Sequence, residues 1–510
     1  MGAERETIAV LGAGTMGTGI AELGARAGVR TLLHDPDAEA LARGIEAARG
    51  RLERKDDDPA LLEPAAEIGA LAGCGLVIEA APESLELKRE LFSRLAGIVG
   101  EECVLATNTS SLSVTAIAAG VPAPERVVGM HFFNPAPVMK LLEVVAGERS
   151  SEAALARARE TGAAMGKRVI DAGDGPGFLV NRCNRPFGLE ALRIVQERLA
   201  TPEQVDRIVR LGGGYRMGPF ELMDLVGLDV GLEVSKSFHA QSFGEPRWRP
   251  SPLVERLVAA GRLGRKSGRG WYAYPDHRRA DPEPRPPGGG DGLIVVAGES
   301  ELALDLLDSA EAAGWDAATP EEAAGELPAL IVDCGTAEED PPLQGAPQVL
   351  LCDAAPLAAL DTGGASAGFY AVPGAALVEL TRSPTTSQAA AGAAERFFTT
   401  LGRHTEWVGD APGLVLGRIA AQLVNEACFA LGEGVGSAAD IDAGMVLGLN
   451  HPRGPLALGD AIGPLEVLAV VLGLQDEYRE ERYRPAPALL RAARTGEPLA
   501  ATCSRERRTR

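Results

Sequence analysis

The segment at residues 7–35 reads TIAVLGAGTMGTGIAELGARAGVRTLLHD, and it decides the fold of the first part of the chain. Its apolar pattern predicts a buried strand, a glycine turn, a helix and a second buried strand, at 7–11, 12–17, 18–27 and 30–34. Two parallel strands joined by a crossover helix form a β-α-β unit. Because more strand-like runs alternate with helical stretches such as 84–95, we predict a doubly wound sheet. These runs are 76–80, 104–107, 127–130 and 141–145.

The glycine turn indicates a nucleotide site. Gly12, Gly14 and Gly17 form GxGxxG between a predicted strand and a predicted helix, where backbone N–H groups can approach a pyrophosphate at the positive helix end. Asp35 ends the second strand, where its carboxylate can bind the adenosine hydroxyls and repel a 2'-phosphate, which favours NAD over NADP. A tight turn followed by a capping Asp before Pro36 is the structural alternative.

After residue 177 the pattern changes to long helices, which predicts an all-α domain with helices at 178–197, 201–211, 218–238 and 253–260. The segment ADPEPRPPGGGD at 280–291 is incompatible with regular structure and is predicted to be the main linker.

A repeat follows the linker. GPGFLVNRCNRPFGLEALRIV around Arg182 aligns with APGLVLGRIAAQLVNEACFAL around Arg418, at an offset of 236 residues (418 − 182). Buried strands are predicted between these helical copies, at 292–297, 329–333 and 349–352. The expected domains are a nucleotide-binding domain at 1–175, a helical domain at 176–280, a linker at 281–291, a degenerate sheet domain at 292–409 and a second helical domain at 410–500.

Composition excludes several classes of protein. The 510 residues include 50 Lys and Arg against 71 Asp and Glu, a net charge of −21, which disfavours a nucleic-acid partner. No apolar run approaches the roughly 18 residues of a membrane helix. The N-terminus lacks a signal-peptide pattern, so we expect a cytoplasmic protein without a membrane partner. The seven cysteines are odd in number and form no CxxC pair, so neither a disulfide framework nor a metal site is expected.

A second group of residues has the composition needed for alcohol oxidation. His131 ends a predicted strand and can act as a base near neutral pH, while Glu143 in the next strand can fix its tautomer. Ser110 and Asn181 can hydrogen-bond the reacting oxygen. Spacing alone leaves open a strand-end histidine bonded to backbone and a solvated glutamate.

The first 275 or so residues resemble the L-3-hydroxyacyl-CoA dehydrogenase family. The matching blocks, in order, are VLGAGTMG, HD, NTSSL, HFFNP followed by KLLEVV, GPGFLVNR, GGYRMGPFELMDLVGLD and GRKSGRGWY. The resemblance implies a Rossmann-type domain followed by a helical domain, and NAD-dependent oxidation of (3S)-3-hydroxyacyl-CoA to 3-oxoacyl-CoA. It also implies His131 as the base, Glu143 as its partner, and Ser110 and Asn181 as substrate contacts. The implied cofactor residues are Gly12, Gly14, Gly17, Asp35, Glu83, Lys88, Asn108, Asn134 and Lys266.

The whole chain is similar to the long bacterial form of this family, which includes dehydrogenases of phenylacetate catabolism and carries a degenerate second copy. Since single-length relatives dimerise through their helical domains, the resemblance implies an internal pseudo-dimer and leaves a further homo-oligomer open. It also makes Lys55 a candidate contact for CoA, although the basic run at 49–55 can equally be a solvated helix face.

The second copy is predicted to have lost its chemistry. At an offset of 286, Gly12, Gly14 and Gly17 fall on Gly298, Ser300 and Ala303. At an offset of 236, His131 falls on Ala367 and Asn181 on Gly417, whereas Glu143 meets Glu379. We therefore expect that the second copy keeps its fold, does not bind NAD and lacks a catalytic base.

Two alternative functions remain open: a non-catalytic NAD-binding or structural relative, and a dehydrogenase for free β-hydroxy acids. The intact Ser110, His131, Glu143 and Asn181 disfavour the first, and the GPGFLVNR and GGYRMGPF blocks disfavour the second. Acyl chain length stays undetermined. No residue in the motifs stands out as a cation for the distal carboxylate of a dicarboxylic substrate.

Overall fold

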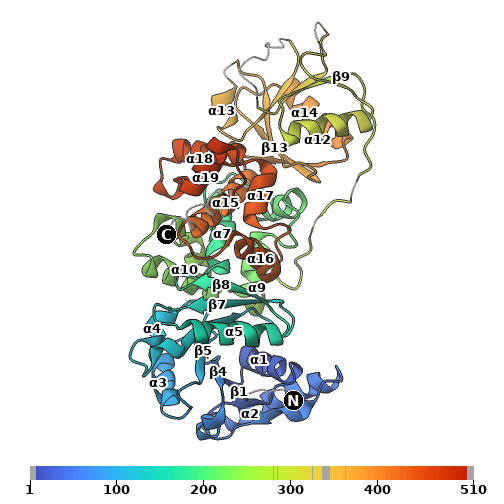
Figure 1. Ribbon diagram of the computed structural model, residues 1–510. Helices are drawn as coiled ribbons and strands as arrows, with labels where there is room; N and C mark the ends of the chain where they lie inside the picture. Colours follow the sequence, from blue (N-terminus) through green and yellow to red (C-terminus); the bar gives the residue numbers. More distant parts are fainter. Residues whose placement is uncertain are drawn as a thin grey trace. The chain divides into compact units, whose positions relative to one another are not determined.

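The computed structural model describes residues 7–279, 281–283, 285–323, 326–335, 345–361 and 363–501. Contacts divide the chain into two units, which are described separately (Figure 1). Unit 1 comprises Met1–Arg182 and Glu433–Leu449, and unit 2 comprises Cys183–Gly432 and Asn450–Arg510.

Unit 1 contains an eight-stranded sheet in the order β3-β2-β1-β4-β5-β6-β7-β8 (Figure 1). Only the β6–β7 pair is antiparallel. The strands are β1 Ile8–Leu11, β2 Thr31–His34, β3 Leu62–Pro64, β4 Leu76–Glu79, β5 Val104–Thr107, β6 Val127–Phe132, β7 Leu141–Ala146 and β8 Arg168–Gly173. The strand order reverses direction between β1 and β4, which confirms the doubly wound sheet and places the ligand crevice at the carboxyl ends of these strands.

The helices of unit 1 cover a core of branched aliphatic side chains that includes Val10, Ile20, Leu33 and Ile78. The α-helices are α1 Thr15–Arg26, α2 Ala38–Glu53, α3 Leu85–Ala96, α4 Val114–Ala118, α5 Glu152–Ala164, α6 Val180–Cys183 and, from the second half of the sequence, α16 Ala438–Leu449. The 3-10 helices are η1 Pro59–Leu61, η2 Ile68–Gly73 and η3 Pro124–Arg126.

Helix α16 packs on β7 and β8, although it is far from both in the sequence. Glycines allow this approach: a Cβ on Gly448 would come within 2.8 Å of Leu141, and one on Gly444 within 2.8 Å of Val180. The predicted second helical domain thus contributes one helix to unit 1.

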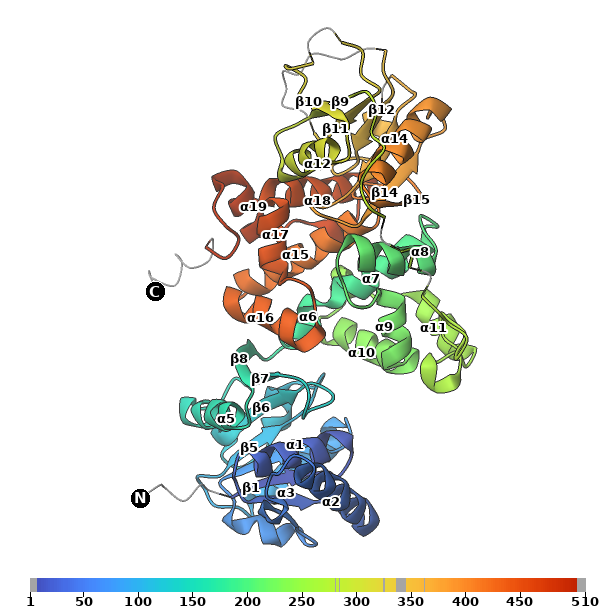
Figure 2. The same ribbon diagram turned by 90° about the vertical axis from the view of Figure 1, so that its right-hand side faces the viewer.

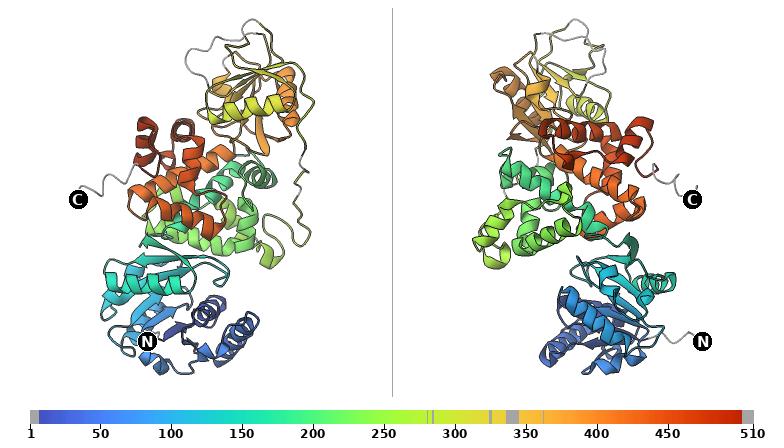
Figure 3. Two further views of the ribbon diagram at one scale, coloured as in Figure 1. Left: turned by 45° about the vertical axis from the view of Figure 1, so that its right-hand side comes forward. Right: turned by 90° about the vertical axis from the view of Figure 1, so that its left-hand side faces the viewer.

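Unit 2 contains a seven-stranded sheet in the order β10-β9-β11-β12-β13-β14-β15, on which α12 and α14 pack (Figure 3). The strands are β9 Leu293–Ala297, β10 Asp316–Ala318, β11 Leu330–Asp333, β12 Gln348–Leu351, β13 Ala367–Tyr370, β14 Leu377–Arg382 and β15 His404–Val408. This order repeats the first sheet without a counterpart of β3, and β13–β14 is again the antiparallel pair. The fold is therefore a doubly wound domain with a helical domain, repeated in degenerate form.

The register of this sheet corrects one predicted equivalence. Glu143 pairs with His131 across β6 and β7, and Glu379 pairs with Tyr370 across β13 and β14. The histidine position is therefore occupied by Tyr370, and the predicted match to Ala367 is wrong. The cause is a shorter connection, because the paired residues are twelve apart in the first copy and nine apart (379 − 370) in the second.

Of the predicted helices, 178–197 and 218–238 are each divided in the structure. The predicted helix at 218–238 is two helices, because Gly227 between them adopts a φ of 103° that continues no α-helix. The α-helices are α7 Arg185–Gln196, α8 Pro202–Arg207, α9 Pro219–Val226, α10 Leu228–Gln241, α11 Pro252–Ala259, α12 Glu301–Ala312, α13 Leu357–Leu360, α14 Gln388–Thr400, α15 Leu416–Gly432, α17 Pro455–Ile462, α18 Pro464–Tyr478 and α19 Pro487–Thr495. A π-helix, η4 Ile208–Gly212, extends α8, and η5 Pro246–Trp248, η6 Arg265–Ser267 and η7 Glu481–Tyr483 are 3-10 helices.

The two copies of the helical segment meet where α7 packs against α15 (Figure 2). Arg418 of α15 is fully buried and donates to Glu190 at 2.9 Å, to Glu197 at 2.6 Å and to the hydroxyl of Tyr483 at 2.7 Å. A buried charge is tolerated only when it is paired in this way.

The described residues of the predicted linker, 281–283 and 285–291, contain neither helix nor strand. Within the described ranges, no single helix has the length and apolar composition of a membrane span; α17 and α18 meet these criteria only jointly, as a pair bent by 97°. The six described cysteines are buried and unbridged, and no cluster of potential metal ligands occurs in this part of the chain.

Candidate active site

The glycine turn joins β1 to α1 in a form that leaves room for a phosphate. Gly12 has a φ of 97°, and a Cβ on Gly17 would overlap the carbonyl oxygen of Gly12. A Cβ on Gly14, by contrast, would meet nothing within 4 Å. Gly14 is also the N-cap of α1 and provides no side chain to satisfy the first N–H groups of the helix. Two of the glycines therefore make the turn possible, and the third leaves the helix end open to an anion.

Asp35 follows β2 at the edge of this turn. Its Oδ2 accepts the N–H of Ala13 at 2.7 Å, and its Oδ1 accepts the N–H of Asp37 at 2.9 Å. The carboxylate is half-buried and retains lone pairs for the hydroxyls of a ribose. The turn and Asp35 thus fit NAD as the sequence predicted.

Lys88 is buried and binds two carboxylates, one at the end of β4 and one in the connection that follows it. Its ammonium lies 2.6 Å from Glu79 at the end of β4 and 3.4 Å from Glu83. Burial alone would raise the pKa of Glu83, but the charge of Lys88 and hydrogen bonds from Thr109, Ser111 and Ser110 outweigh it and hold this pKa below its ordinary value. Glu83 therefore ties the loop after β5 to α3 as a carboxylate.

Sequence reasoning missed Glu79, although a carboxylate at the end of a buried strand is a recognisable signal. Glu79 is fully buried, accepts a hydrogen bond from Thr107 at 2.7 Å and holds the ammonium of Lys88. It acts on the candidate cofactor residues through Lys88.

His131 and Glu143 face each other across β6 and β7. The Nδ1 atom of His131 lies 2.5 Å from Oε2 of Glu143, and the Nε2 atom lies 3.1 Å from the hydroxyl of Ser110. Glu143 is fully buried, and its Oε1 accepts the N–H groups of Leu179 and Val180 at 3.2 and 2.9 Å. The carboxylate assigns the proton to Nδ1, which leaves the lone pair of Nε2 for a substrate proton.

The structure brings most of the other predicted residues to the same edge of the first sheet. Asn108 follows β5 and its Oδ1 accepts the N–H of Phe132 at 2.8 Å, which links the loops after β5 and β6. Asn134 is exposed just beyond β6, and Asn181 is half-buried on α6. Asn181 comes directly after the two N–H groups that bind Glu143.

Two predicted residues lie elsewhere in the molecule. Lys55 follows α2, where it contacts buried Glu22 at 3.3 Å beside a stronger Arg51–Glu22 pair at 2.6 Å. Lys266 belongs to unit 2 and pairs with Asp229 at 2.6 Å. Both lysine side chains are about half exposed, and their roles in ligand binding stay predictions.

The second copy has filled the corresponding positions with protein groups. Gly298 keeps a φ of 114°, but the hydroxyl of Ser300 accepts the N–H of Ala303 and so caps α12 where Gly14 leaves α1 open. Glu379 accepts the N–H groups of Val415 and Leu416 at 2.8 and 2.9 Å, as Glu143 does with the equivalent residues.

Tyr370 closes the rest of this second site. Its ring lies against Gly417, where any Cβ would overlap it, so it covers the place of Asn181. Burial outweighs the hydrogen bonds from Val415 and Leu416 and raises the pKa of Glu379 to about 8. The second copy retains the carboxylate as Glu379. Tyr370 replaces the imidazole and fills the space beside Gly417.

Comparisons with known proteins agree with this geometry. The NAD-binding domain model of 3-hydroxyacyl-CoA dehydrogenase matches residues 7–175, and the C-terminal domain model matches 177–274 and again 413–504. The chain is 38% identical to 3-hydroxyadipyl-CoA dehydrogenase of Escherichia coli over 500 residues, which covers 96% of this chain and 97% of that protein. It is 42% identical to a 3-hydroxybutyryl-CoA dehydrogenase of Mycobacterium tuberculosis over 284 residues, 53% of this chain and 98% of the relative.

Solved structures give the same result. The crystal structure of 3-hydroxybutyryl-CoA dehydrogenase from Escherichia coli K12 matches with a TM-score of 0.80 and 36% identity, over 96% of this chain and 98% of that chain. A relative of known structure thus shares the fold over nearly the whole length of this chain. The chain belongs to the 3-hydroxyacyl-CoA dehydrogenase family.

Proposed function

We propose that the protein is an NAD-dependent (3S)-3-hydroxyacyl-CoA dehydrogenase that forms 3-oxoacyl-CoA, with His131 as general base. The observation that carries this proposal is the row Glu143–His131–Ser110, in which a buried carboxylate fixes the imidazole and leaves Nε2 facing a hydroxyl. The full-length likeness to 3-hydroxyadipyl-CoA dehydrogenase supports the substrate class.

In this mechanism Nε2 of His131 takes the proton of the substrate C3 hydroxyl, and the Glu143 carboxylate stabilises the resulting imidazolium through Nδ1–H. The chemistry that NAD would supply at this site is that of an acceptor for the hydride from C3. Ser110 already hydrogen-bonds Nε2, and its hydroxyl is placed to bind the substrate oxygen in the same position. Asn181 donates to this oxygen from α6, whose start is anchored to Glu143.

NAD would be held by the residues whose geometry fits it. Gly12, Gly14 and Gly17 receive the pyrophosphate at α1, and Asp35 binds the adenosine ribose. We assign Asn108, Asn134, Glu83 and Lys88 to the remainder of the NAD site, and Lys266 and Lys55 are proposed contacts of NAD and CoA respectively.

The test is the production of NADH from 3-hydroxybutyryl-CoA, followed by its absorbance. A His131→Gln variant should lose turnover by about 10²–10⁴-fold, because the substrate proton has no acceptor. Wild-type turnover in this variant would refute the assignment. Binding of NAD without turnover of any acyl-CoA would instead favour a non-catalytic relative, and oxidation of free β-hydroxy acids alone would favour the remaining alternative.

We also propose that the second helical domain serves as an internal dimer partner. The packing of α7 on α15 through Arg418, Glu190 and Glu197 supports this idea within unit 2. Light scattering tests the consequence: a mass of 53.1 kDa indicates the internal pair alone, and twice this mass indicates an additional homodimer. We further propose the domain limits predicted above and a cytoplasmic location for the protein.

A further inference from the structure

Arg185, the first residue of α7, is a cation without a counter-charge. One guanidinium nitrogen donates to the hydroxyl of Ser235 at 3.2 Å, and the guanidinium carbon lies 4.7 Å from the centre of the Phe238 ring. Its Nε is buried and has no hydrogen-bond partner. Within the described part of the chain Arg185 makes no ion pair, although the side chain as a whole keeps partial exposure.

This arrangement is unfavourable for the protein alone. Burial lowers the pKa of Arg185 to about 10, with no carboxylate to oppose the shift. The residue also stands at the N-terminus of α7, where the helix dipole repels a cation. Since buried cations in proteins are normally paired, the unpaired guanidinium points to an anion that the protein does not itself contain.

The fold does not need this arginine. At the offset of 236 that relates the helical copies, Arg185 corresponds to Ala421, which is buried in α15 of the non-catalytic copy. The helical domain therefore packs with a methyl group at this position. Arg185 occurs only in the copy that carries His131.

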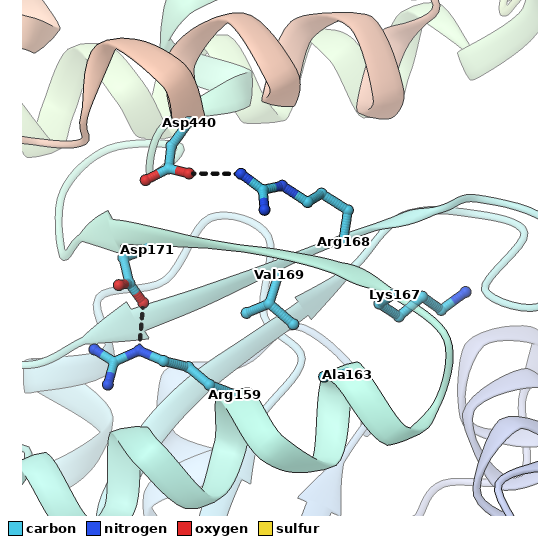
Figure 4. Close-up of a pocket in the computed structure, with 7 residues that line it drawn as sticks. All are labelled: Arg159, Ala163, Lys167, Arg168, Val169, Asp171 and Asp440. Carbon is cyan, nitrogen blue, oxygen red and sulfur yellow. Dashed lines mark hydrogen bonds and ion pairs between the residues drawn. The ribbon is translucent and has the colours of Figure 1, made fainter.

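The pocket between α5 and β8 holds more cations but fits no anion (Figure 4). Arg159 points to Asp171 at 2.8 Å, and Arg168 points to Asp440 at 3.8 Å. Lys167 donates to two backbone carbonyls. Both arginines of this pocket are therefore paired with carboxylates, and the ammonium of Lys167 is held by carbonyl oxygens, whereas Arg185 has only a hydroxyl and an aromatic ring.

Arg185 follows Asn181 by four residues (185 − 181). Such a chain segment spans at most about 14 Å, whatever the arrangement of the units. Asn181 is the proposed contact of the oxygen on C3, so the chain itself keeps Arg185 within this distance of the group that binds C3.

We propose that Arg185 binds a carboxylate at the far end of the acyl chain and so makes the enzyme selective for dicarboxylic 3-hydroxyacyl-CoA. The proposal rests on the dehydrogenase activity proposed above and names its substrate class. The planar guanidinium offers two parallel N–H groups to a carboxylate. The ligand supplies the missing counter-charge, which a methyl-terminated chain cannot do.

The experiment compares two substrates of equal chain length, 3-hydroxyadipyl-CoA and 3-hydroxyhexanoyl-CoA, on the full chain. The wild type should prefer the dicarboxylic substrate in kcat/KM, and Arg185→Met should reduce this preference about 10- to 100-fold, chiefly through KM. Arg185→Lys keeps the positive charge but lacks the two parallel N–H groups. Its preference for the dicarboxylic substrate should lie between those of the wild type and Arg185→Met. Lys236→Met, which removes an exposed cation from α10, is the matched control and should leave the preference unchanged.

The outcomes separate the two proposals. If the wild type oxidises neither substrate, the proposed function fails. If it oxidises both equally, or if Arg185→Met reduces both kcat/KM values by the same factor, the inference about Arg185 is overturned. Inhibition of the wild type by adipyl-CoA and hexanoyl-CoA, which lack the hydroxyl, provides a test without any variant. Adipyl-CoA should inhibit more strongly at low salt, and equal inhibition would contradict the proposal.

Discussion

Replacing Glu143 by Gln tests whether the buried carboxylate controls the protonation of His131. In the wild type Oε1 accepts the N–H groups of Leu179 and Val180, and Oε2 accepts Nδ1–H of His131. The variant can keep its single oxygen on the two backbone donors, so its NH₂ group must face Nδ1. The imidazole then carries its proton on Nε2, the atom that has to accept the substrate proton.

The expected loss follows from this geometry. Without the base, turnover of 3-hydroxybutyryl-CoA should fall about 10²–10⁴-fold, which corresponds to a barrier higher by about 3–5 kcal/mol. The KM should change little, because Glu143 contacts the substrate only through His131. Initial rates of NADH formation measure both parameters.

The second copy offers a matched control. Glu379 accepts the N–H groups of Val415 and Leu416 with one oxygen each, in the same place in the fold. Glu379→Gln should retain wild-type turnover, because Tyr370 and not a histidine faces it. Full activity in Glu143→Gln, or an equal loss in both variants, would refute the role assigned to the carboxylate.

Three further predictions concern the turn, the helical core and pH. Gly14→Ala should weaken NAD binding in titrations and leave the fold intact, whereas Gly17→Ala should also lower the thermal unfolding temperature, because only its Cβ overlaps the backbone of Gly12. Arg418→Met should reduce the free energy of unfolding in urea by about 1–3 kcal/mol, because buried Glu190 loses one of its two arginine partners and keeps only Arg193; an unchanged midpoint would contradict this. Because burial raises the pKa of Glu379 to about 8, the folded protein retains a proton that the unfolded chain releases near pH 4.3. Stability should therefore fall as pH rises from about 5 to 8, and thermal unfolding of Glu379→Gln should show a flatter pH dependence.

The sequence alone determined much of the first half of the molecule. The GxGxxG turn and Asp35 follow from local rules, because glycine conformation and strand ends act within a few residues. The strand pattern likewise predicted β1, β4 and β5 within a residue, while β3 and β8 were missed. The short β3 has only three residues, and β8 mixes buried with exposed positions, so both carry little apolar signal.

The repeat was also visible in the sequence, since the offset of 236 places Arg182 of α6 on Arg418 of α15 and aligns α7 with the rest of α15. The residue that faces Glu379 across the two strands was not visible in the sequence. Tyr370 occupies it because the loop between β13 and β14 is shorter, and strand register depends on the length of the loop and on pairing across the sheet.

Tertiary structure alone decided the electrostatic environment of single side chains. An arginine in the sequence is always a cation, but only packing shows that Arg418 meets two carboxylates while Arg185 meets a hydroxyl and an aromatic ring. Burial and distance determine the energy of a charge, and residues that are remote in the sequence set both quantities. The sequence therefore specified the reaction chemistry of this protein, and its packing specified where a charged substrate can be recognised.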